Sequence, residues 1–183
     1  MLKKILTSSS LTLHREINMS PKHTVKADTP SRYIPQGTHP KLDAIDGAVA
    51  PTPVASAGPE SDLDFQISYP IIWPQNSILF QTDDPVYENN YTYAGFFNNF
   101  LDAIDGSYCS YSAFGETGNS PDDPPYPDPA PGGYKGKLQC GVYKPTNVIS
   151  MSYGGQEYQL PASYQQRQCN EWVSPFYSSK LAQ

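Results

Sequence analysis

The fold is decided first by residues 58–66, which read Gly-Pro-Glu-Ser-Asp-Leu-Asp-Phe-Gln. Proline is favoured at the first position of a helix, and the acidic residues after it stabilise the positive end of the helix dipole. We therefore expect a helix that begins at residues 58–60 and is broken by Pro70. A strand is the rival interpretation, because apolar residues stand at the alternate positions Leu63, Phe65 and Ile67.

Helical and strand patterns alternate on both sides of this stretch. The short apolar runs 71–73 and 78–80 are typical of buried strands, and residues 147–153 before a Gly-Gly pair read as another. Apolar residues recur at three- and four-residue steps in 96–104, which predicts an amphipathic helix, and residues 161–172 predict one more. The alternation indicates an α/β protein with a parallel sheet flanked by helices.

The remaining segments are predicted as loops. Residues 1–33 have no clean periodicity and are expected to be a flexible, unassigned N-terminal segment. Residues 34–59 are punctuated by proline and glycine, and the dense prolines of 120–131 exclude a helix or a central strand. Pro-Pro-Tyr-Pro at 124–127 is a candidate polyproline ligand, but we favour a rigid surface loop.

The hexapeptide Leu-Asp-Ala-Ile-Asp-Gly occurs twice, at 42–47 and 101–106, without matching flanks. We interpret this as coincidence rather than a structural repeat. An EF-hand calcium loop is excluded, because its first and third ligand positions would be Leu101 and Ala103. The three cysteines have no paired short spacing for zinc, so no metal or other cofactor site is predicted in the chain.

The composition limits the partners of the protein. The chain has 183 residues and a net charge of −6, and an acidic surface repels phosphates, so nucleic acid is not an expected partner. No apolar run approaches the roughly 18 residues needed to cross a bilayer, so no membrane partner is expected. Residues 1–6 begin like a secretion signal, but the apolar run is too short and too polar to predict a signal peptide.

Glu60 and Asp64 are the candidate catalytic residues. They stand four residues apart, so on a helix both carboxyl groups share one face. Two carboxyl groups that share a proton suit general acid–base catalysis, whereas the alternative is a pair of solvated charges in the first helical turns. A Ser-His-Asp triad is not predicted, because no Gly-x-Ser-x-Gly sequence is present and the histidines, His14, His23 and His39, precede or border the folded region.

Several long stretches resemble the fungal sedolisins, which are serine-carboxyl peptidases. The matching stretches occur in the order of that family and are 34–40, 58–66, 100–109, 131–142, 148–155 and 164–171. The resemblance implies that residues 34–172 form the N-terminal part of a sedolisin-like catalytic domain. The fold would be a partial subtilisin-like fold, incomplete at its C-terminus, and residues 173–183 would be a divergent tail.

The resemblance also assigns roles. Glu60 would be the base that accepts the proton of a serine nucleophile, and Asp64 would orient Glu60, an arrangement suited to acidic pH. The substrates would be peptides or proteins, cleaved by endopeptidase or tripeptidyl-peptidase action outside the cell. No Ser-Gly-Asp-Ser-Gly or Gly-Thr-Ser sequence is present, so the serine, the oxyanion aspartate and the C-terminal calcium site of the family are missing.

From those missing motifs we expect the chain to be inactive alone, as a truncated peptidase. The alternative is a non-catalytic binding or regulatory fragment of the same fold. Because the family is secreted, we also expect a disulfide between Cys109 and Cys140, with Cys169 left over. Asn90 begins an Asn-Tyr-Thr triplet and is a candidate glycosylation site.

Overall fold

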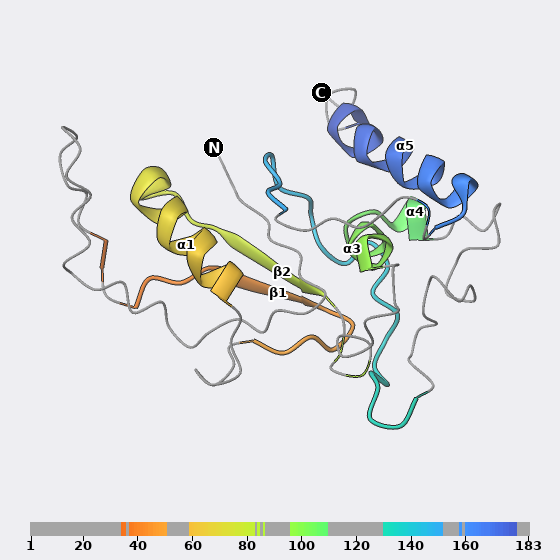
Figure 1. Cartoon of the computed structure of the whole chain (residues 1–183), viewed down its shortest axis with the longest axis horizontal. Helices are drawn as coiled ribbons and strands as arrows, with labels where there is room; N and C mark the ends of the chain where they lie inside the picture. Colours follow the sequence, from red (N-terminus) through yellow and green to blue (C-terminus); the bar gives the residue numbers. More distant parts are fainter. Residues whose placement is uncertain are drawn as a thin grey trace.

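The computed structural model describes residues 34–35, 37–50, 59–82, 84, 86, 96–109, 130–151, 158 and 160–178. At 59–62, 96 and 174–178 only the backbone is described. The elements are β1 (Lys41–Ile45), α1 (Pro59–Ile72), β2 (Ile78–Thr82), α3 (Phe96–Ile104), α4 (Gly106–Cys109) and α5 (Ala162–Ser178) (Figure 1). The segment 1–33, predicted to be flexible, lies outside the described residues.

The centre of the fold is a pair of parallel strands. β1 and β2 are paired in parallel, with Leu42 opposite Leu79 and Ile45 opposite Thr82. Parallel neighbours need a crossover connection, and α1 supplies it, running back along the strands in the opposite direction (Figure 1). The unit agrees with the predicted α/β class. The prediction of a loop over 34–59 was wrong for residues 41–45, which form β1.

The sheet is covered on both faces. Leu79 packs with Phe65 and Tyr69 of α1 on one face. The next residue, Phe80, points to the opposite face, where it packs with Ile45 and with Phe100 of α3. All six side chains are essentially inaccessible to solvent. Burial on both sides is the usual state of a parallel strand and explains why β2 reads as a short continuous apolar run.

A line of aromatic rings connects the elements on the α3 face of the sheet. The ring of Phe80 meets those of Tyr143 and Phe100 edge to face, at centroid distances of 5.9 and 5.5 Å. Phe100 in turn stacks on Trp172 of α5 at 5.7 Å, and Phe97 meets Trp172 edge to face at 6.4 Å. Aromatic pairs at these distances add stabilisation beyond the area they bury, so they couple α5 to the sheet through α3.

Helix α1 begins at Pro59, as predicted, but it does not end at Pro70. The helix continues through Pro70 to Ile72, so the strand predicted for residues 71–73 was wrong. Proline at this position removes one helical hydrogen bond, yet the turn is retained because Tyr69 is fully buried and its carbonyl accepts a 3.0 Å hydrogen bond from the Trp73 amide.

The strand predicted for residues 147–153 is absent from its described part, residues 147–151, which is irregular. Among the described residues the sheet has two strands, β1 and β2, and the segment 147–151 pairs with neither. Ile149 packs against the core, whereas Val148 and Met151 are exposed. This apolar run therefore has no strand partner, and it covers part of the core through Ile149.

The repeated hexapeptide takes two different conformations. Its first copy forms most of β1 and the turn after it, and its second copy forms the end of α3 and the start of α4. Identical local sequence thus gives a strand in one place and a helix in the other, and tertiary context decides between them. In the first copy the context is the parallel partner β2, and in the second it is the apolar helical period of residues 96–104.

Tyr143 joins equivalent positions of the two copies. Its hydroxyl donates a 2.7 Å hydrogen bond to the carbonyl of Ala44 in β1, and its amide donates a 3.0 Å bond to the carbonyl of Ala103 in α3. Gln139 adds a second bond to the Ala44 carbonyl at 3.2 Å, through its side-chain amide. The irregular segment 139–143 therefore ties β1 to α3 on one side of the molecule.

Gly141 sits at the tightest point of that segment. Its amide donates a 2.8 Å hydrogen bond to the carbonyl of Asp102, and its φ of 60° lies in the left-handed region. A Cβ at this position would be 2.6 Å from the backbone nitrogen of Gly106, whereas a Cβ on Gly106 would meet nothing closer than 3.7 Å. Only Gly141 needs to be glycine for the two backbones to approach.

We predict that Gly141→Ala lowers the free energy of unfolding by about 1–3 kcal/mol, the cost of holding a non-glycine residue in a strained conformation. Gly106→Ala is the matched control, because it adds the same methyl group on the opposing backbone with room to spare. Chemical denaturation of the two variants beside the parent chain measures the difference. Equal stability of the two variants would contradict the packing described here.

Candidate active site

Both predicted catalytic residues belong to the first half of α1. Glu60 is the second residue of the helix and Asp64 the sixth, so the two positions lie one turn apart on the same face. Asp64 is half-buried and stands next to the fully buried Phe65, which faces the sheet. For Glu60 the structure describes the backbone and not the side chain. The helix, rather than the rival strand, is what the structure forms here.

The direction of α1 fixes where these positions lie relative to the sheet. Because α1 runs opposite to β1 and β2, its N-terminal end points toward the carboxyl ends of the strands (Figure 1). Ligands of open α/β sheets generally bind outside that edge, where loops and helix N-termini meet. Glu60 and Asp64 therefore belong to the end of α1 that points toward this edge of the sheet.

Two further aspartates lie at the same edge and were not singled out from the sequence. Asp46 follows β1 with a φ of 57°, Asp84 follows β2, and each is only 3% exposed. Asp84 accepts hydrogen bonds from the amides of Val86 and Tyr134, at 2.8 and 2.7 Å, so it holds the loop around residue 134. The available signal was weak: Asp46 directly follows the apolar pair 44–45, and Asp84 comes four residues after the end of the apolar run 78–80.

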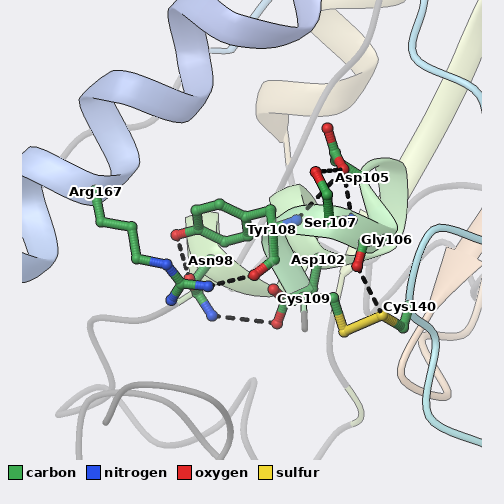
Figure 2. Close-up of a disulfide and its surroundings, with 9 residues drawn as sticks. All are labelled: Asn98, Asp102, Asp105, Gly106, Ser107, Tyr108, Cys109, Cys140 and Arg167. Carbon is green, nitrogen blue, oxygen red and sulfur yellow. Dashed lines mark hydrogen bonds between the residues drawn. A yellow bond between two sulfur atoms is a disulfide. The ribbon is translucent and has the colours of Figure 1, made fainter. Parts of the chain in front are cut away.

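A second group of ionisable side chains lies where α5 meets α3 and α4. Asp105, between α3 and α4, accepts hydrogen bonds from the amide and hydroxyl of Ser107, at 2.7 and 2.6 Å, and from the amide of Tyr108 at 3.3 Å (Figure 2). Burial works to raise the pKa of Asp105, but these hydrogen bonds outweigh it and hold the pKa below its ordinary value. Asp105 is thus the ionised cap of α4.

Arg167 fastens α5 to the same place. Its guanidinium lies 3.9 Å from the ring centre of Tyr108 and donates a hydrogen bond to the Tyr108 carbonyl (Figure 2). The hydroxyl of Tyr108 donates to Asn98 inside α3, whose side-chain amide donates to Asp102 at 3.2 Å. Arg167 is 5% exposed, so this is an interior contact rather than a surface ion pair.

Glu171 lies one turn beyond Arg167 on α5 and is 9% exposed. Burial, and then the negative charge of the neighbouring Asp105, raise the pKa of Glu171 to about 7, while Arg167 acts in the opposite direction. Both the charge and the side chain of Asp105 act to raise this pKa. Neither residue was predicted, because their sequence separation of 66 positions gives no local signal.

The cysteines close a large loop. A disulfide joins Cys109, at the end of α4, to Cys140 in the 139–143 segment, with their Cα atoms 5.5 Å apart. Cys169 is exposed and is not in a disulfide. Asn90, the glycosylation candidate, lies outside the described residues, as do most residues of the proline-rich loop between the paired cysteines.

Within the described ranges, no three histidine, cysteine, aspartate or glutamate side chains gather in a group that could hold a metal ion. A search of the same ranges found no helix with the length and apolar character needed to cross a membrane.

Comparison with known proteins relates the chain to fungal peptidases. It is 69% identical over 143 residues to tripeptidyl-peptidase sed1 of Aspergillus fumigatus and 62% identical over 144 residues to aorsin of Aspergillus oryzae, covering 78% of the chain in each case. Tripeptidyl-peptidase SED1 of Arthroderma otae is 35% identical over 145 residues, or 75% of the chain. No family model and no solved structure matches.

The chain spans about a fifth of the length of these relatives, with 21%, 22% and 20% of each covered. Identity of this size over more than three quarters of the chain reflects common descent. Over its matched part, the chain therefore belongs to the fungal sedolisin family of peptidases.

Proposed function

We propose that this chain supplies the carboxylate part of the active site of a serine-type peptidase that hydrolyses peptide bonds at acidic pH. The observation that carries the proposal is the position of Glu60 and Asp64, one turn apart on the end of α1 that points toward the carboxyl edge of the sheet. Two relatives are named tripeptidyl-peptidases, which supports peptides or proteins as the substrates. Endopeptidase and tripeptidyl-peptidase action both fit this half of the site.

In the proposed mechanism Glu60 accepts the proton of a serine hydroxyl as that oxygen attacks the peptide carbonyl, and Asp64 holds the Glu60 carboxylate in position. A carboxylate base remains usable at acidic pH, where a histidine would already be protonated. The serine and the oxyanion aspartate belong to family motifs that do not occur in these 183 residues. We therefore assign the chain a role in activating the nucleophile and no nucleophile of its own.

The proposal includes the setting in which the site works. We propose that the two-stranded unit is part of a subtilisin-like sheet, with α1 as the helix that carries the base. An extracellular location is supported by the Cys109–Cys140 disulfide, because disulfides persist in oxidising compartments. Calcium would be held by a family segment that this chain does not match, and no residue here is assigned to it.

We predict that Glu60→Gln abolishes most of the activity of a full-length peptidase that carries this segment. The protein to measure is tripeptidyl-peptidase sed1 with residues 34–172 of this chain in place of its own matching segment, which the 69% identity makes practicable. Loss of the general base should lower kcat/KM by about 10²–10⁴-fold at acidic pH. Asp64→Asn should lower kcat more than it raises KM, because it misplaces the base without touching substrate.

Asp62→Asn is the matched control for both variants, since it removes an acidic residue from the same turns of α1 at a position between the two. It should retain the activity of the parent hybrid protein. Full activity in Glu60→Gln, or an equal loss in Asp62→Asn, would contradict the assignment of Glu60 as the base.

We also predict that the chain alone, residues 1–183, does not cleave tripeptidyl substrates at acidic pH. Adding a serine-directed phosphonate or fluorophosphonate probe should leave no covalent label on it, because no serine of the chain matches the family nucleophile. Turnover that such a probe inhibits, with a labelled serine identified by mass spectrometry, would show that the chain has a nucleophile and overturn this part of the proposal.

A further inference from the structure

The junction of α5 with α3 and α4 combines aromatic and charged side chains. Trp172 stacks on Phe100, and Tyr164 at the start of α5 is 1% exposed. Arg167 lies between these two residues along the helix. Its guanidinium makes a cation–π contact with the ring of Tyr108 and donates a hydrogen bond to the Tyr108 carbonyl. These contacts hold α5 in place by burial and by one cation–π contact.

Glu171 is an acidic residue on this buried face. It follows Tyr164 by seven residues and Arg167 by four, so it belongs to the same side of α5. Its Oε1 atom is buried and has no hydrogen-bond partner in the described part of the chain. An ionised carboxylate in such a place is costly, because a buried charge needs a counter-charge or hydrogen-bond donors.

The group that Glu171 meets across the junction is another carboxylate. Asp105 cannot readily take up a proton, because Ser107 and Tyr108 already donate three hydrogen bonds to it and these bonds cap α4. Among the described residues, the other charge that acts on the pKa of Glu171 is Arg167, on its own helix. Of the two facing carboxyl groups, Glu171 is therefore the one that holds the proton.

We propose that the Glu171–Asp105 contact makes the docking of α5 proton-dependent: α5 is held on the α3–α4 unit at acidic pH and loosens as the pH rises to neutrality. At acidic pH the neutral Glu171 carboxyl group donates a hydrogen bond to Asp105. Once Glu171 loses its proton, two negative charges face each other in a half-apolar junction and repel.

The direction of the effect follows from proton linkage. The pKa of Glu171 is raised in the folded protein, to about 7, so between its ordinary value and 7 the docked state binds more protons than the undocked state. The stabilisation is therefore complete below the ordinary pKa of a glutamate and is lost as the pH rises through 7. The contact does not depend on the peptidase chemistry proposed above, and its failure would leave that proposal untouched.

Amide hydrogen exchange of the intact, oxidised chain tests the contact directly. After correction for the intrinsic pH dependence of exchange, amides of residues 164–173 should lose protection by about tenfold or more between pH 5 and pH 8. Amides of β2, which is buried between α1 and α3, should change much less over the same range. The loss should have its midpoint near pH 7.

Three variants separate the carboxyl pair from a general effect of charge. Glu171→Gln keeps a donor for Asp105 without a titratable group, so it should stay protected at pH 8. Asp105→Asn keeps an acceptor for the α4 amides and removes the facing charge, so it should also stay protected. Gln166→Glu, which adds a carboxyl group on an exposed position of the same helix, should behave like the parent chain.

The proposal is overturned if α5 of the parent chain is unprotected at pH 5, or equally protected at pH 5 and pH 8. It is overturned as well if Glu171→Gln loses protection with the same midpoint as the parent.

Discussion

The parallel pairing of β1 with β2 is the constraint on which the rest of the structure depends. Two parallel strands cannot be joined by a tight turn, so the chain between them must cross over, and here it does so as α1. Packing of Phe65 and Tyr69 on Leu79 fixes that helix on one face. Its direction is then set, and with it the position of Glu60 and Asp64 at the end of α1 that points toward the carboxyl ends of the strands.

The other face of the sheet is organised by contacts between segments far apart in sequence. Tyr143 reaches both β1 and α3, and the aromatic line from Tyr143 through Phe80 and Phe100 ends on Trp172 in α5. The disulfide at Cys140 secures the same segment to α4. The position of α5 therefore depends on α3, and the position of α3 depends on the sheet. The interface of α5 also contains the carboxyl group of Glu171.

The sequence predicted the elements whose signal is local and missed those that depend on partners. Proline and acidic residues mark the start of α1, and the helical period of residues 96–104 marks α3; both helices form there. The hexapeptide Leu-Asp-Ala-Ile-Asp-Gly shows the limit, because it is a strand beside β2 and a helix in α3. Residues 71–73 and 147–151 have apolar runs without a strand neighbour, and neither is a strand. For the site, spacing and family resemblance predicted Glu60 and Asp64, and their catalytic role stays a prediction. The Glu171–Asp105 pair has no local signal, because 66 positions separate the two residues.

The central claim is that Glu60 and Asp64 form one functional pair on the exposed edge of the β1–α1–β2 unit. A crystal structure at acidic pH, of this chain or of a full-length relative carrying it, measures this most directly. The account predicts that a carboxyl oxygen of Glu60 lies within hydrogen-bond distance of one of Asp64, about 2.5–3.0 Å, with Glu60 facing an open groove. Carboxyl groups that diverge, or a Glu60 that points from the convex outer surface of α1 into solvent, would contradict it.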